Sequence, residues 1–128
     1  MYNSLDLFQT AGAMARNAGA RQAVVARNIA NADTPGYQAQ TIPTFKEIYA
    51  GGVSSAMRVT RPGHIGGNGN QPEIDQRKTP IGEPSPNGNT VSIDTEMLNS
   101  AEITREHDQA LAVYRHAMTV LRTSLGRS

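Results

Sequence analysis

Histidine and acidic side chains are the groups in this sequence best suited to acid–base catalysis or metal binding. The chain has three histidines and 11 acidic residues. His107 and His116 are nine residues apart, which places them on opposite faces of a helix, about 180° around its axis. His64 lies in a distant, glycine-rich segment. Glu102 and Glu106 are one helical turn apart, so they lie on one face, where they can contact Arg105 or neighbouring subunits. This spacing favours polar contacts at a subunit interface, or solvated side chains, over a metal or acid–base site.

Other classes of site also lack their required residues. The glycines at Gly66–Gly69 are not followed by the lysine and helix of a phosphate-binding loop, and nothing resembles a nucleophile elbow. The chain has no cysteine and therefore no thiolate nucleophile or disulfide. Arg16, Arg21 and Arg27 are basic, but the net charge is only +1. We expect no catalytic residue, metal, cofactor, small-molecule ligand or nucleic acid, and interpret these arginines as contacts to acids of a neighbour.

The most informative segment is Asn28–Tyr37, which has the sequence NIANADTPGY. Asn31 can end a helix in the left-handed conformation. Thr34 precedes proline and is therefore restricted to extended angles. Pro35 fixes φ at the second position of a turn, and Gly36 tolerates positive φ at the third. The segment is predicted to stop a helix and to continue into a type II turn.

The polar side chains of this segment can make the turn rigid by bonding nearby backbone groups. The ring of the closing tyrosine is suited to packing against a helix, with its hydroxyl at a polar edge. The candidate residues for this bend are Asn28, Asn31, Thr34, Pro35, Gly36 and Tyr37.

A helix is predicted for residues 1–31. Residues at alternating spacings of three and four form a coiled-coil seam. Alanine dominates this seam, so a second helix can approach closely. Its members are Phe8, Ala11, Ala15, Ala18, Gln22, Val25 and Ile29.

A longer helix is predicted from Asp94 to Leu125, within the segment 94–128. Asp94 is the expected N-cap, and Gly126 is the expected stop. The same alternation produces a seam that is polar in its first half and apolar in its second. Its members are Met97, Ser100, Thr104, His107, Leu111, Tyr114, Met118, Leu121 and Leu125.

Residues 32–93 form the middle of the chain. Glycine and proline are dense over 51–90, which predicts an irregular and partly flexible segment. Short β-strands fit Met57–Thr60 and Thr90–Ile93. The predicted fold is therefore mainly α, with two long terminal helices packed as an antiparallel coiled coil. Aromatic residues are only 5% of the chain, so we expect apolar surface to be buried against partners.

The segment Asn28–Tyr37 resembles the signature of the flagellar axial proteins, which are the rod, hook and hook-associated subunits. In that family an alanine-rich N-terminal helix ends in Asn-x-x-Asn-x-x-Thr-x-Gly-Tyr, and every fixed position is met here. Arg61–Ile65 and Asn87–Met97 further resemble the proximal rod subunits. One sister type of proximal rod protein, FlgC, usually carries a different segment before its last helix and is the nearest alternative.

The resemblance implies a structural component of the bacterial flagellar basal body, in the rod that spans the periplasm. Such subunits assemble helically around the export channel, link the membrane-embedded base to the distal rod and transmit torque for motility. The implied partners are further copies of the chain, rod proteins of the FlgC, FlgF and FliE types, the base ring and the type III export apparatus. The first residues lack the features of a cleavable signal peptide, which agrees with export by that apparatus.

Two other functional classes remain open at this point. A secreted binding module that folds on a partner would use the middle segment, and deletion of residues 66–89 would distinguish it from a rod subunit. An enzyme is the weakest alternative, because no constellation of catalytic residues supports it.

Overall fold

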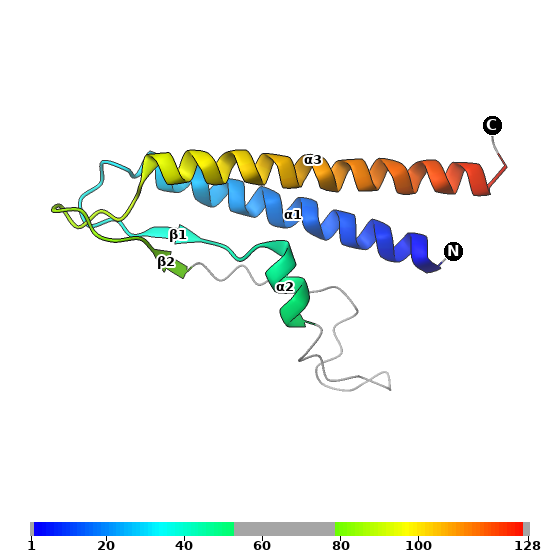
Figure 1. The fold of residues 1–128 in the computed structure, drawn as a ribbon, viewed down its shortest axis with the longest axis horizontal. Coiled ribbons are helices and arrows are strands. Elements are labelled where there is room, and N and C mark those ends of the chain that lie inside the picture. The colour runs from blue at the N-terminus through cyan, green and yellow to red at the C-terminus, as the bar shows by residue number, and fades with distance from the viewer. Residues whose placement is uncertain (1, 53–78, 127–128) are drawn as a thin grey trace.

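The computed structural model describes residues 2–52 and 79–126, which form an elongated molecule (Figure 1). Two long helices are accompanied by two short strands and a short helix. In chain order these elements are α1 (Tyr2–Ala30), β1 (Ala39–Thr41), α2 (Phe45–Gly52), β2 (Thr79–Ile81) and α3 (Ile93–Ser124).

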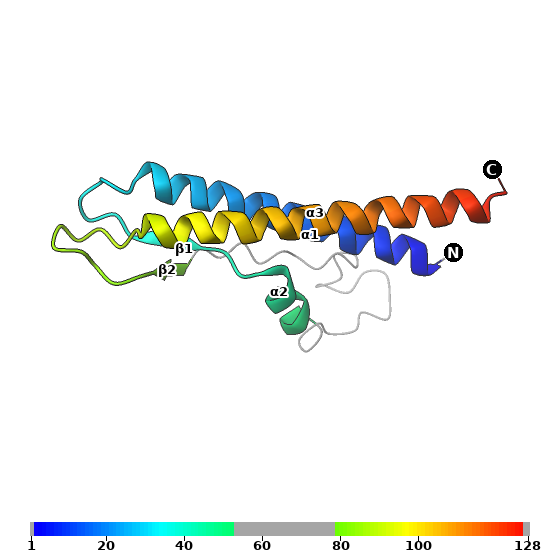
Figure 2. The same ribbon diagram turned by 45° about the horizontal axis from the view of Figure 1, so that its top comes forward.

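The main body is an antiparallel pair formed by α1 and α3, with both chain ends at the same end of the molecule (Figure 1). The two helices cross at a shallow angle, which is clearest when Figures 1 and 2 are compared. The 32 residues of α3 correspond to about 48 Å of helix. This arrangement confirms the prediction of a mainly helical fold built on two long terminal helices.

Side-chain contacts between the two helices fix their register. Gln22 Nε2 donates a hydrogen bond to Ser100 Oγ at 2.8 Å. Arg21 forms an ion pair with Glu106. Nearer the chain ends, the rings of Phe8 and Tyr114 meet edge to face, with centroids 5.1 Å apart. These contacts join residues at opposite ends of the sequence.

The start of α3 differs from the prediction. Its N-cap is Ser92, with extended angles, so Asp94 lies in the first turn rather than at the cap. The predicted strand at Thr90–Ile93 is wrong, because Val91 N donates to Asn89 Oδ1 instead of a strand partner and Ile93 already begins α3. The stop is as expected, since Gly126 follows α3 with φ of +69°.

The middle of the chain contributes a second layer beside α1 (Figures 1 and 2). β1 and β2 pair antiparallel, with Ala39 opposite Ile81 and Thr41 opposite Thr79. The expected strand at Met57–Thr60 lies outside the described residues. Of these elements, β2 and the last residues of α2 lie within the segment 51–90, whose glycine and proline content predicts irregular structure, whereas β1 and most of α2 precede it.

Helix α2 begins with a capping box, a reciprocal pair of bonds between Thr44 and Glu47. The backbone N–H of Thr44 donates to Glu47 Oε2 at 2.8 Å, and Glu47 N donates to Thr44 Oγ1 at 3.3 Å. The bond from the Thr44 backbone, then that from its hydroxyl, lowers the pKa of Glu47 below its ordinary value of 4.5. The box explains why a helix starts here.

Helix α1 is buried on two sides. One side carries Ala11, Ala18 and Val25 and faces α3, where Ile103 joins the cluster. The other carries Asn17 and Val24 and is covered by the chain around β1, where Asn17 Nδ2 donates to the carbonyl of Pro43 at 3.1 Å. The small side chains on the first side allow the two helices to approach closely.

Candidate functional site

The turn motif, residues 28–37, begins at the buried side chain of Asn28. Its Nδ2 donates to the carbonyl of Gln40 at 2.8 Å, and its Oδ1 accepts from Gln40 N at 3.1 Å. The Oδ1 also accepts from the hydroxyl of Tyr37 at 3.2 Å. One amide therefore ties the last turn of α1 to both the tyrosine and the backbone of β1.

The turn itself has the predicted geometry at Gly36. Its φ is +73°, and Tyr37 N donates to the carbonyl of Thr34 at 3.3 Å. The expected left-handed conformation of Asn31 is wrong, because no non-glycine residue in the described ranges has positive φ. Instead, Asn31 Nδ2 bonds the carbonyl of Arg27 at 2.8 Å, and its Oδ1 accepts from Thr34 Oγ1 at 3.2 Å. The side chain takes over the capping that the backbone was expected to provide.

The return loop, residues 82–91, holds the turn motif through Asn89, which is only 3% exposed. Its Nδ2 lies within hydrogen-bond distance of three carbonyls, those of Asn31 at 2.9 Å, Ala32 at 2.8 Å and Thr34 at 2.8 Å. Its Oδ1 accepts from Val91 N at 2.8 Å. This side chain thereby ties the return loop to the backbone of the turn that follows α1.

Backbone bonds complete the junction between the two loops. Gly36 N donates to the carbonyl of Asn87, and Thr90 N donates to that of Tyr37, both at 3.0 Å. Within the return loop, the backbone at Gly82 and Thr90 is so close that a Cβ on Gly82 would lie 2.5 Å from the carbonyl oxygen of Thr90. The φ of Gly82 is +93°, so both the space and the backbone conformation require glycine there.

The junction is chemically suited to hold backbone rather than to react. The side chains that make its hydrogen bonds are neutral amides, hydroxyls and a phenol, and their bonds are made within the junction. In contrast, Thr34, Pro35 and Gly36 expose their outer surface to solvent. The inner side of the motif is therefore fixed by hydrogen bonds, and the described residues leave its outer side exposed to solvent.

The predicted packing residues of α1 divide into two groups. Ala18 and Val25 are buried against α3, whereas Phe8 and Ala15 are partly exposed and Ile29 is 39% exposed. The Ile29 side chain lies at the end of the helix that meets the junction. The α1 seam thus serves packing within the chain over most of its length.

The buried line of α3 lies one residue earlier than the predicted one. It consists of Glu96, Ile103, Ala110 and Ala117, seven residues apart. Two of the four are alanines, and their small side chains allow the two helices to pack closely. The predicted packing residues there are Leu111, Met118 and Leu121, which are partly exposed, and Tyr114 and Leu125, which are exposed.

Sequence reasoning missed three buried polar side chains, Asn17, Asn89 and Glu96. Asn89 lies in the segment Asn87–Met97 that carried part of the resemblance, so its position in that segment was the available signal. Asn17 and Glu96 lie within the predicted helices, and the residues around them show no pattern that would indicate burial. No signal in the sequence indicated them.

Two other kinds of site are absent from the described ranges. There, no three His, Cys, Asp or Glu side chains are grouped so that they could hold a metal ion. Likewise, no helix in residues 2–52 and 79–126 is both long and apolar enough to cross a membrane.

Comparison with known proteins finds one family. A family model described as "Flagella basal body rod protein" matches residues 9–38, which cover most of α1 and the turn motif. The chain is also similar to flagellar basal body rod protein FlgB of Agrobacterium fabrum, with 33% identity over 108 residues, 81% of each chain.

The chain is also similar to FlgB proteins of two other bacteria. FlgB of Salmonella typhimurium is 36% identical over 103 residues, 73% of each chain. FlgB of Escherichia coli is 35% identical over 100 residues, 72% of each chain. The similarity in sequence therefore extends well beyond the turn motif.

Proposed function

The chain belongs to the FlgB family of flagellar basal body rod proteins, and we propose that it builds the proximal part of the rod. As a member of that family it is a structural component of the basal body that assembles with other rod components. In the proposal, copies of the chain stack helically around the export channel. They link the membrane-embedded base to the distal rod and transmit torque for motility.

The observation that carries this proposal is the apolar surface that one chain leaves uncovered. Large apolar side chains are exposed at both ends of the helix pair, and Leu98 and Leu125 are 73% and 72% exposed. Exposed patches of this kind mark interaction sites. The exposed residues are Leu5, Leu7, Ile29, Tyr49, Ile93, Met97, Leu98, Tyr114, Val120 and Leu125.

The same proposal assigns a separate structural role to each part of the chain. Residues 1–31 and 94–128 form the coiled-coil domain of the inner tube, and 32–93 supply the turn motif and the middle segment. The turn motif sets the angle at which α1 leaves the tube, because its inner side is fixed by Asn28 and Asn89. Phe8, Ala15 and Leu121 pack between helices of one subunit or of neighbours.

The partners follow from the position in the rod. They are further copies of the chain, rod proteins of the FlgC, FlgF and FliE types, the base ring and the type III export apparatus, which exports the chain without cleaving a signal peptide. The chain carries out no catalytic step. Nothing in the geometry favours the sister FlgC type or a separate binding module.

The test is the phenotype of cells that lack this chain. Basal bodies purified from such cells and viewed by electron microscopy should contain the membrane ring but no rod, and the cells should not swim. Expression of the wild-type chain should restore both. Intact rods in the deleted strain would contradict the proposal.

A further inference from the structure

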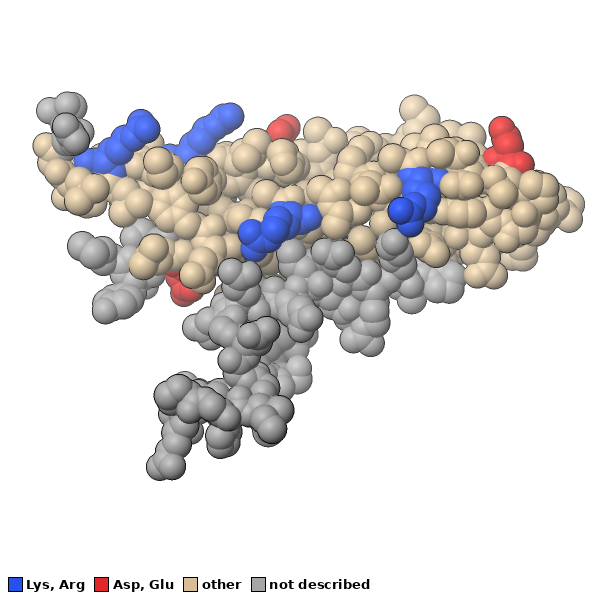
Figure 3. All heavy atoms as spheres, turned by 180° about the vertical axis from the view of Figure 1, so that it is seen from behind, with Lys and Arg blue, Asp and Glu red and all other residues tan. Residues whose placement is uncertain are grey.

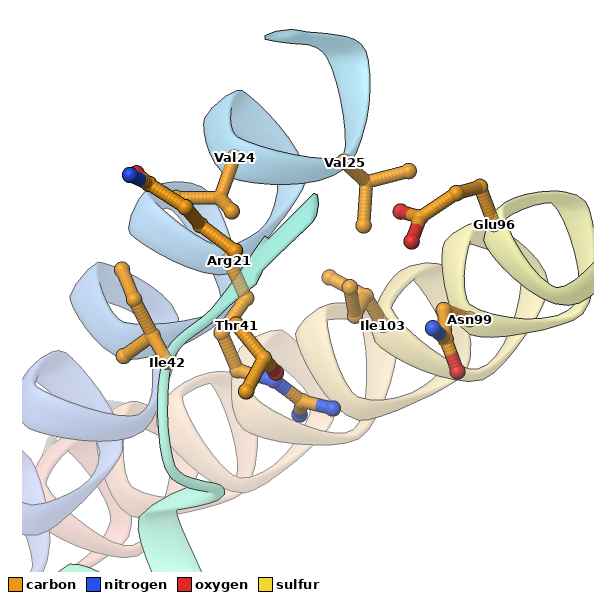
Figure 4. A pocket seen from close by; sticks show the side chains of 9 residues that line it. Arg21, Val24, Val25, Thr41, Ile42, Glu96, Asn99 and Ile103 are labelled. Carbon is orange, nitrogen blue, oxygen red and sulfur yellow. The ribbon is translucent and has the colours of Figure 1, made fainter. Parts of the chain in front are cut away.

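A small cavity lies beside the helix pair, between α1, β1 and the first turns of α3 (Figure 4). Its volume is about 50 Å³, and it is partly open to solvent. One part of its wall is polar, with Gln40, Thr41, Asn99 and Glu96. Another part is apolar and includes Val25 and Ile103. The cavity thus has walls for both a charged group and the hydrocarbon stem that carries it.

Glu96 is the unusual member of this wall. It is only 2% exposed, and its Oε2 has no hydrogen-bond partner in the part of the chain that the structure describes. Figure 4 shows its carboxylate directed from α3 into the space beside Val25 and Ile103. Burial of a carboxylate without a partner is costly, so such a group is expected to gain one in the working assembly.

The basic residue nearest to the cavity does not fill this role. Arg21 lines the same cavity, but its guanidinium is paired with Glu106, the only ion pair among the described residues. Other basic side chains are exposed, including Arg16, Arg27, Arg105, Arg115 and Arg122. On the face seen in Figure 3, the blue basic side chains are spread along the molecule instead of forming one patch. They are thus suited to single contacts with separate acceptors.

We propose that the cavity receives one arginine or lysine side chain from a second copy of this chain. The inference rests on the proposed function, because it requires that copies stack in the rod. The carboxylate of Glu96 would pair with the incoming cation, the amide and hydroxyl oxygens of Asn99 and Thr41 would accept further bonds, and the apolar wall would contact the stem. In a head-to-tail assembly the donor and the cavity lie on different surfaces, so each copy can offer one and fill one.

The first test replaces the charge without changing the shape. Glu96→Gln is compared with Glu83→Gln, the same change at an exposed site of the return loop. The Glu96→Gln monomer should be at least as resistant to urea as wild type, because a neutral amide is less costly to bury. When Glu96→Gln is expressed in a strain lacking the chain, the number of rods should be lower by about tenfold or more than with wild type. Glu83→Gln should form rods normally.

The second test finds the donor and does not depend on whether Glu96→Gln folds. Every lysine and arginine except Arg21 is changed singly to Gln, and rod formation is counted in basal bodies. One variant should reproduce the loss, and combining it with Glu96→Gln should add little, since both remove the same contact.

The outcomes separate this inference from the proposed function. If the wild-type chain fails to restore rods, the proposed function is wrong. If wild type and Glu96→Gln restore rods equally well, the Glu96 carboxylate needs no cation from a second copy, and the inference is wrong. The inference is also overturned if no single lysine or arginine change lowers rod formation.

Discussion

Three asparagine side chains organise the turn motif. Asn28 and Asn89 are buried and bond backbone on both sides, while Asn31 caps the end of α1. An uncharged amide is well suited to this role because it both donates and accepts, and its burial leaves no net charge without a partner. A carboxylate of the same shape could accept only. The amide nitrogen is therefore the essential atom.

The change Asn89→Asp tests this reading. It keeps the shape but turns a donor toward three carbonyls into an acceptor, so we expect the free energy of unfolding to fall by about 3 kcal/mol. Urea denaturation followed by far-UV circular dichroism measures the change.

The matched control is Asn87→Asp, two residues away. Asn87 uses its Oδ1 to accept from Asn89 N at 3.0 Å, and aspartate keeps that acceptor. Its effect should stay within about 0.5 kcal/mol. Equal losses in the two variants would mean that charge in the loop, rather than the lost donor, is responsible.

The residues of the junction also show what the sequence could and could not predict. The turn over Thr34–Tyr37 was predictable because proline and glycine fix it locally. The role of Asn89 was not, because its partners lie 55 to 58 residues earlier in the chain. Asn31 was correctly chosen as a helix stop but for the wrong reason, since its side chain rather than its backbone makes the cap.

Among the elements, the two long helices followed from spacing alone, but their buried face did not. The periodicity favoured the line with larger side chains, such as Leu111, whereas the structure buries the neighbouring alanines at Ala110 and Ala117. Close helix packing selects small residues, which a hydrophobicity pattern undervalues. Helix α2 was missed although Thr44 and Glu47 have the spacing of a capping box.

The capping box predicts a pH dependence for α2. The pKa of Glu47 is lower in the folded chain than its ordinary value of 4.5, so the stabilising bond is fully present above 4.5. It is lost as the pH falls through the lowered pKa. Nuclear magnetic resonance of the Glu47 carboxyl and the Thr44 amide should show a common midpoint below 4.5.

The variant Thr44→Ala provides the comparison for this titration. It removes the hydroxyl but leaves the backbone N–H, which is the larger cause of the lowered pKa. The midpoint should therefore rise only part of the way toward the ordinary value. A wild-type midpoint at or above that value would show that the capping box is absent in solution.

At the scale of the whole molecule, the helix pair is only partly covered by its own chain. The buried core consists largely of alanine with a few valine and isoleucine side chains, while several leucines remain outside. A monomer with so small a core gains little from apolar burial. Assembly would bury the flanks of α3 and so add stability that a single chain lacks.

A charge on the flank of α3 should therefore block assembly. Leu111→Asp or Leu121→Asp should abolish swimming and leave secretion of the chain unchanged, because both leucines lie beside the buried alanine line. Motility in soft agar and immunoblots of the secreted fraction measure the two effects. Ala112→Asp, at an exposed neighbouring position, should swim normally. Normal swimming of both leucine variants would exclude this flank as an interface.

The antiparallel pairing of α1 with α3 also determines when the chain can fold. The contacts that hold the pair join residues 78 and 85 positions apart, so the contact order is high for a helical protein. Such topologies fold slowly, because a long loop must close before the contacts between α1 and α3 can form. During synthesis, the side of α1 that faces α3 has no partner until the last quarter of the chain has emerged. The helix pair therefore cannot form until α3 has been synthesised, and until then the apolar side of α1 that faces α3 is accessible to other proteins.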